Sequence, residues 1–205
     1  MIIMAADAQG NDLKAVNIPV TGAIAFAPYG TKIPTPEEGG KKEYKLPKEF
    51  KRLGLITSDG GPEWTLEADG DAQEFWQEGY SMPSGLANCE LTFTLAQTDP
   101  TTVEFIRGIK PDANGFFVVD AGGNPNRYAL YAEEIFKNTM IRRRAGANVQ
   151  IKEVKESKSE RGNILGYEVT VKFGTDPQHE GGQFGEWNIF PDGVKGDVTP
   201  AAITG

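Results

Sequence analysis

The chain has 205 residues, 25 glycines and a formal net charge of −8. That length suffices for one domain with its own core, while an acidic chain lacks the clustered positive surface that general nucleic-acid binding needs. A single cysteine, Cys89, and a single histidine, His179, exclude an intrachain disulfide and any zinc site of four cysteines or of two cysteines and two histidines. No run of 18 apolar residues is present, so no membrane-spanning helix is expected.

Alternation of apolar and polar residues predicts a mainly β chain. Strands are expected, in chain order, at 16–26, 53–57, 63–68, 88–97, 115–120, 127–136, 149–154, 167–173 and 185–190. The pattern is clearest at 63–68, 88–97 and 167–173. Short strands separated by Gly-rich turns are typical of a two-sheet β-sandwich or barrel.

One short helix is expected at about 99–107. Asp99 is a good N-cap, Pro100 suits the first helical position, and Gly108 stands where a helix ends in left-handed backbone geometry. Two turns of helix are unstable alone, so this helix must pack on the sheet.

Three segments, 1–14, 31–50 and 191–205, show no periodic pattern of apolar residues. Residues 152–163 are charged, which predicts an exposed hairpin tip. Residues 1–205 are therefore expected to form a single domain. It has an N-terminal arm (1–14), a core (15–190) and a C-terminal arm (191–205). The irregular loop at 31–50 is long for a compact domain, and such loops are often functional.

Charge is distributed unevenly along the chain. From 53 to 106 there is no Lys or Arg, and the same stretch carries ten carboxylates: Asp59, Glu63, Glu67, Asp69, Asp71, Glu74, Glu78, Glu90, Asp99 and Glu104. Basic residues gather instead at 41–52 and 142–144. Two interpretations fit this charge pattern. The acidic stretch forms an ordinary solvated surface, or it forms a surface that repels polyanions or pairs with the basic residues of the same chain.

Catalytic motifs are not found. There is no Gly-Xaa-Ser-Xaa-Gly elbow and no phosphate-binding loop; His179 lies in a polar loop and Cys89 begins an apolar strand face. The carboxylates around Asp69 lack the later ligands of a calcium-binding loop. We expect no enzyme, cofactor or metal site. Trp64 and Trp187 stand at core-facing strand positions, whereas Trp76 does not, and an exposed aromatic group among carboxylates marks a protein contact.

The order of several segments resembles one known family. Residues 23–34 read AIAFAPYGTKIP and residues 50–60 read FKRLGLITSDG; LTFTL follows at 91–95, and TDP at 98–100 leads into the short helix. This order resembles the major tail tube proteins of long, non-contractile-tailed phages, particularly the major tail subunits of actinobacteriophages. The chain is too short to carry the large immunoglobulin-like domain found in some of these proteins.

The resemblance implies a structural virion protein without enzymatic activity. Six subunits would form a ring whose strands join into an inner β-barrel, and stacked rings would form the conduit that delivers the genome to the host. It implies assembly in the host bacterial cytoplasm into the virion tail, with no membrane involved. Expected partners are further copies of the chain, a tape measure protein, a tail terminator and distal tail or baseplate proteins. Genomic DNA would pass through without specific binding.

The resemblance also suggests roles for the charged residues. The candidates for lining the lumen are Glu63, Glu67, Asp69, Asp71 and Glu74. The candidates for contacts between subunits or rings are Lys41, Lys42, Lys48, Arg52, Trp76, Arg142, Arg143 and Arg144. The arms and the 31–50 loop would become ordered only when rings stack. The alternative is a β-sandwich module that binds carbohydrate or a receptor on a virion or cell surface.

Overall fold

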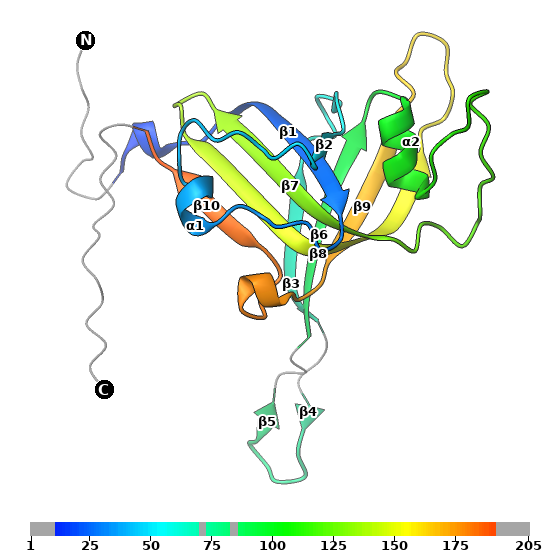
Figure 1. Ribbon diagram of the computed structural model, residues 1–205. Helices are drawn as coiled ribbons and strands as arrows, with labels where there is room; N and C mark the ends of the chain where they lie inside the picture. Colours follow the sequence, from blue (N-terminus) through cyan, green and yellow to red (C-terminus); the bar gives the residue numbers. More distant parts are fainter. Residues whose placement is uncertain (1–10, 70–72, 83–85, 192–205) are drawn as a thin grey trace, which may run out of the picture.

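The computed structural model describes residues 11–69, 73–82 and 86–191 and confirms a mainly β chain with a short flanking helix (Figure 1). The strands are β1 (Pro19–Pro28), β2 (Lys51–Arg52), β3 (Glu63–Asp69), β4 (Gln73–Glu74), β5 (Ser81–Met82), β6 (Leu86–Leu95), β7 (Arg127–Phe136), β8 (Ile141–Glu156), β9 (Tyr167–Phe173) and β10 (Gly185–Ile189). The helices are α1 (Pro36–Gly39) and α2 (Pro100–Arg107), with 3₁₀ turns at Leu13–Ala15 and Pro177–His179.

The long strand β8 joins two layers of one antiparallel sheet. The strand order is β2-β1-β7-β8-β9-β6-β3, with β10 also paired to β8. Residues 141–146 of β8 pair with β7, and residues 141–145 also pair with β10, whereas residues 149–156 pair with β9. We call β2, β1, β7, β10 and the first half of β8 the first layer. The second half of β8, with β9, β6 and β3, is the second layer.

The main core lies between the two layers. It is built from alternating strand positions and from α2: Ile24, Phe26, Leu53, Cys89, Leu91, Phe93, Leu95, Phe105, Ile106, Tyr128, Leu130, Ala132, Val149, Val169, Val171 and Phe173. The apolar residues alternate with polar ones along β6 and β9, because successive side chains of a strand point to opposite faces. This packing confirms the sandwich predicted from the sequence.

Helix α2 follows the prediction closely. The Asp99 carboxylate accepts a hydrogen bond from the Thr102 backbone N–H at 2.8 Å, and Gly108 has a left-handed φ of 73°. Burial alone would raise the pKa of Asp99, but hydrogen bonds from Thr102, Gln97 and Thr101 outweigh it and lower that pKa. The cap therefore stays ionised at neutral pH.

Two strand predictions and the predicted hairpin tip need correction. Residues 115–120 form no strand, because the Asp112 carboxylate accepts hydrogen bonds from the Asn114 and Phe116 backbone N–H groups, which closes a local turn. Residues 53–57 pair with β6 only at an isolated bridge between Ile56 and Leu95. Residues 152–156 continue β8 as a strand, so the exposed tip is confined to the turn that follows.

Cys89 has the role expected of a small core residue. Its side chain is fully buried, and burial raises the pKa of its thiol to about 11. Because the thiolate is the reactive form, we expect Cys89 to resist a thiol reagent such as a maleimide in the folded chain. Labelling in native buffer and in denaturant, followed by mass spectrometry, checks this; rapid labelling of the folded protein would contradict it.

Candidate assembly surfaces

The second layer presents one broad polar face. The register of β3, β6, β9 and β8 places polar residues in rows on the side opposite the core. They are Glu63, Thr65, Glu67, Glu90, Thr92, Thr94, Gln150, Glu153, Lys155, Glu168, Thr170 and Lys172, and none of them is buried. Hereafter this set is called the polar face. In the first layer the outer side is instead covered by residues 31–50, whose Ile33, Tyr44, Leu46 and Phe50 pack against it.

Charges on the polar face are partly compensated within the chain. Lys152, whose ammonium also reaches this face, contacts the Glu90 carboxylate at 2.6 Å, and Lys155 lies 3.3 Å from both Glu153 and Glu168. The hydrogen bond from Lys152 lowers the pKa of Glu90, so this carboxylate stays ionised. The predicted lumen candidates Glu63 and Glu67 are exposed on β3 at the other side of the face.

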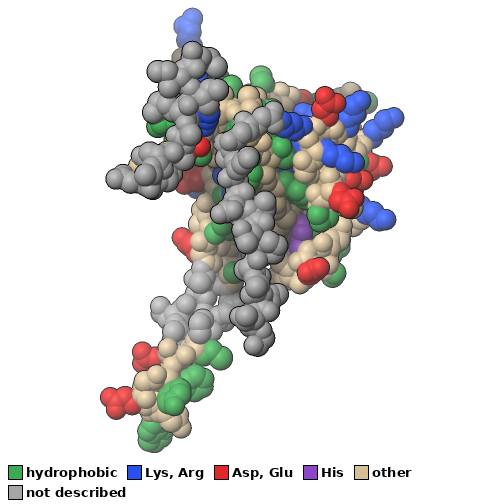
Figure 2. Space-filling model, turned by 90° about the vertical axis from the view of Figure 1, so that its left-hand side faces the viewer, with side chains coloured by type: hydrophobic (Ala, Val, Ile, Leu, Met, Phe, Trp, Pro, Cys, Tyr) green, Lys and Arg blue, Asp and Glu red, His purple; other side chains and the backbone are tan. Residues whose placement is uncertain are grey.

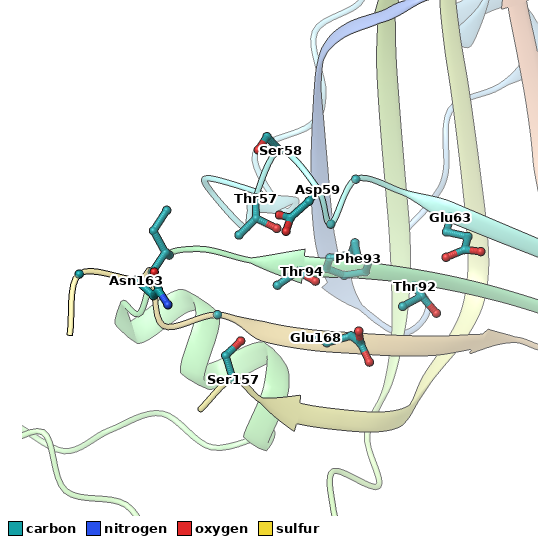
Figure 3. Close-up of a pocket in the computed structure, with 15 residues that line it drawn as sticks. Thr57, Ser58, Asp59, Glu63, Thr92, Phe93, Thr94, Ser157, Asn163 and Glu168 are labelled. Carbon is teal, nitrogen blue, oxygen red and sulfur yellow. The ribbon is translucent and has the colours of Figure 1, made fainter. Parts of the chain in front are cut away.

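A groove of about 670 Å³ lies at one end of the polar face (Figure 3). The turn at 57–61 and the turn after β8 form its walls, and Thr92, Thr94 and Glu168 line its floor. Its lining contains no histidine or cysteine, and the described residues hold no cluster of three or more metal-ligating side chains.

Residues 31–50, here called the strap, are packed on the first layer by their own contacts. The Arg143 guanidinium donates to the backbone carbonyls of Gly39, Lys41 and Lys42 and contacts the Glu133 carboxylate at 2.7 Å. The Trp187 indole N–H donates to the Pro36 carbonyl at 3.0 Å. The strap also supplies Ile33, Tyr44, Leu46 and Phe50 to a second apolar cluster. It is thus ordered in the single chain, contrary to the expectation that stacking is required.

The three arginines predicted as subunit contacts all have partners in their own chain. Arg143 is 2% exposed, and its guanidinium donates hydrogen bonds to the strap. Arg142 pairs with Glu134 at 2.8 Å, while Arg144 lies over the Trp64 ring at 4.5 Å and contacts Glu186. Glu133 and Glu134 stand only ten and eight residues before their arginines, on the neighbouring strand β7. The strap carbonyls, Trp64 and Glu186 are distant in sequence, so no local pattern reveals them. The other predicted basic contacts, Lys41, Lys42, Lys48 and Arg52, are exposed.

A small hairpin of β4 and β5 lies beyond the ends of β3 and β6 (Figure 1). We call residues 73–82 the aromatic hairpin, because its exposed apolar side chains are Phe75, Trp76, Tyr80 and Met82. Trp76 is 98% exposed, and Figure 2 shows the apolar group beside acidic side chains, which are Glu74 and Glu78 in this segment. Glu74 lies on this hairpin and apart from the polar face. Asp71 lies outside the described residues, and Asp69 ends β3.

Within the described residues no helix is long and apolar enough to cross a membrane. The chain matches the family model for phage tail tube protein over residues 9–184. A search of curated proteins gave no match. Since the family model spans most of the chain, this protein belongs to the phage tail tube protein family.

Proposed function

We propose that this member of the phage tail tube family assembles into rings of six that stack into the tail tube, the conduit for genome delivery. The observation that carries the proposal is the asymmetry of the two layers. The first layer is covered on its outer side by the strap, while among the described residues no segment covers the polar face of the second layer in the same way. A hydroxyl-rich and charged sheet face without apolar residues suits the wall of a water-filled channel.

The acidic residues of β3 would then face the passing DNA. We propose that Glu63, Glu67 and Asp69 line the lumen and repel phosphate groups, so that DNA slides instead of binding. We propose the same role for Asp71, which lies outside the described residues, and for Glu74, which lies on the aromatic hairpin. Because each phosphate contact releases counterions and strengthens binding, even a few unpaired cations in a channel would slow transport.

The strap and the aromatic hairpin would make contacts to neighbouring copies. Lys41, Lys42, Lys48 and Arg52 are exposed cations that can pair with acidic groups of another subunit. Each exposed pair contributes about 1 kcal/mol at most, so these residues would set register rather than affinity. As a tail component the protein would also meet a tape measure protein inside the tube, and terminator and distal tail proteins at its ends.

The test is assembly of the purified protein. We expect hollow polymers with a regular axial repeat in negative-stain images, and sedimentation that depends on protein concentration. A chain that stays monomeric at high concentration would refute the proposal. If that monomer also retained glycans, the surface would instead be a carbohydrate-binding module, with the exposed hairpin aromatics as its platform.

Replacing Trp76 by serine is expected to raise the critical concentration for assembly more than tenfold. Burying an indole at an interface contributes on the order of 2 kcal/mol, and aromatic residues dominate the energy of protein contacts. Trp76→Phe retains an apolar ring and should recover most of the assembly. Light scattering against concentration measures the effect. The melting temperature of the monomer should not change, because Trp76 is 98% exposed; unaltered assembly of Trp76→Ser would exclude this contact.

A further inference from the structure

The polar face carries lysines as well as carboxylates. Lys155 on β8 and Lys172 on β9 belong to it, and the Lys152 ammonium reaches it from β8. On a surface that DNA must pass, a free lysine favours capture, because each ammonium that contacts a phosphate releases counterions and strengthens binding. The groups around these three side chains therefore decide whether the face holds DNA.

Glu90 lies between two of these lysines. Lys172 on β9 is the register partner of Glu90 on β6, and the Lys152 ammonium donates to the Glu90 carboxylate at 2.6 Å. The Glu90 side chain is only 12% exposed. The hydrogen bond from Lys152 and, to a smaller extent, the charge of Lys172 lower the pKa of Glu90, so this carboxylate keeps its charge well below neutral pH. One carboxylate thus stands beside two ammonium groups.

The third lysine of the face is held by two carboxylates. Lys155 lies 3.3 Å from both Glu153 and Glu168, and hydrogen bonds to them raise the pKa of Lys155. Three carboxylates therefore stand beside three lysines on one face of the sheet. Because β3 adds Glu63 and Glu67 to the same face and contains no lysine, the face as a whole stays acidic.

We propose that three carboxylates of the polar face mask its lysines from nucleic acid. Glu90 masks Lys152 and Lys172. The other two, Glu153 and Glu168, mask Lys155. The inference rests on the proposed function, in which DNA passes along this face. A paired ammonium must leave its carboxylate before it can contact a phosphate, so a phosphate that touches the wall gains little by staying there.

Masking also explains why an acidic channel wall contains lysines at all. Like charges directly opposite each other on neighbouring strands destabilise a sheet, whereas opposite charges stabilise it. In the register of the second layer Glu90 stands opposite Lys172, and Glu168 stands opposite Lys155. The lysines thus support the sheet, and their carboxylate partners prevent them from retaining DNA. Repulsion by the carboxylates of β3 adds to this effect at longer range.

Removing the charge of Glu90 tests the masking. Glutamine keeps the shape of the side chain but leaves two ammonium groups uncompensated. Binding of a fluorescent DNA duplex to the unassembled chain is measured by anisotropy at several salt concentrations. Relative to wild type, E90Q should steepen the slope of log association constant against log salt by about 1.8, since each phosphate contact contributes about 0.9. Between about 50 and 200 mM salt, its affinity should then fall about tenfold more than that of wild type.

Three further variants separate masking from net charge. E37Q removes one charge from an exposed carboxylate of the strap and should leave the slope unchanged. The triple variant E90Q/K152Q/K172Q should return to the wild-type slope, because the gain requires the freed lysines. The double variant E153Q/E168Q frees Lys155 without touching Glu90 and should steepen the slope about half as much as E90Q. Binding by exposed lysines of the strap is common to all variants and cancels in the comparison.

An unchanged slope in both E90Q and E153Q/E168Q would overturn the masking. An equal gain in E37Q would overturn it too, because the effect would then follow from net charge alone. All of these measurements use the unassembled chain, so they do not depend on tube formation. Failure of the wild type to form tubes would instead refute the proposed function.

Discussion

Replacing Arg143 by methionine is expected to destabilise the folded chain by about 3–5 kcal/mol, the usual cost of removing one partner from a buried ion pair. The guanidinium is 2% exposed and satisfies three strap carbonyls together with the Glu133 carboxylate. Methionine fills similar space but donates no hydrogen bond. The carbonyls of Gly39, Lys41 and Lys42 would then lack their donor, and the Glu133 carboxylate would lose its cation although it keeps the Tyr131 hydroxyl, unless the strap lifts away and lets water reach these groups.

Two measurements separate strap release from general loss of stability. The urea midpoint should fall, and trypsin should cut the native variant at Lys41 and Lys42 under conditions where the wild type survives. The variant Lys158→Met is the control, since Lys158 is 84% exposed in an exposed pair with Glu160 and its loss should hardly move the urea midpoint. Equal trypsin resistance of Arg143→Met and wild type would mean that the apolar cluster alone holds the strap.

The strands of the second layer could be predicted because their signal is local. Leu91, Phe93 and Leu95 alternate with polar residues, and a period of two determines which side chains share a face. The same rule placed Glu63 and Glu67 on one side of β3. The role of Arg143 could not be predicted in this way. Three adjacent arginines on a strand resemble a solvated segment, and the atoms that bury the middle one lie about a hundred residues earlier in the chain.

Assembly surfaces are harder to derive than strands. Trp76 stood out as an aromatic residue among carboxylates. The structure leaves its side chain 98% exposed, and its contact with another copy stays a prediction. The edge of β8 at 151–156, which has no partner on the β7 side among the described residues, had no such signal, because it depends on where β7 begins. An edge is defined by the strand that is missing beside it, which local propensity does not encode.

Replacing Phe105 by alanine is expected to cost about 3–5 kcal/mol, the range for removing a large buried aromatic side chain. Phe105 is fully buried and joins both layers: its ring centroid lies 4.8 Å from that of Phe26 on β1 and 6.4 Å from that of Phe93 on β6. It also lies 5.4 Å from the Tyr128 ring on β7. Urea unfolding measures the loss, which is a large fraction of the total stability of a typical domain.

The effect of Phe105→Ala on assembly should exceed that expected from stability alone. The variant Ile109→Ala, at a position 47% exposed just beyond α2, should change stability by less than about 0.5 kcal/mol and serves as the control. In a closed ring every copy must hold its second layer at the same angle to the first, and Phe105 packs against strands of both. A cavity there lets the layers shift, so Phe105→Ala should assemble poorly even at temperatures where circular dichroism finds it folded. Normal tubes from the folded variant would mean that the strand connections alone, through β8, fix that angle.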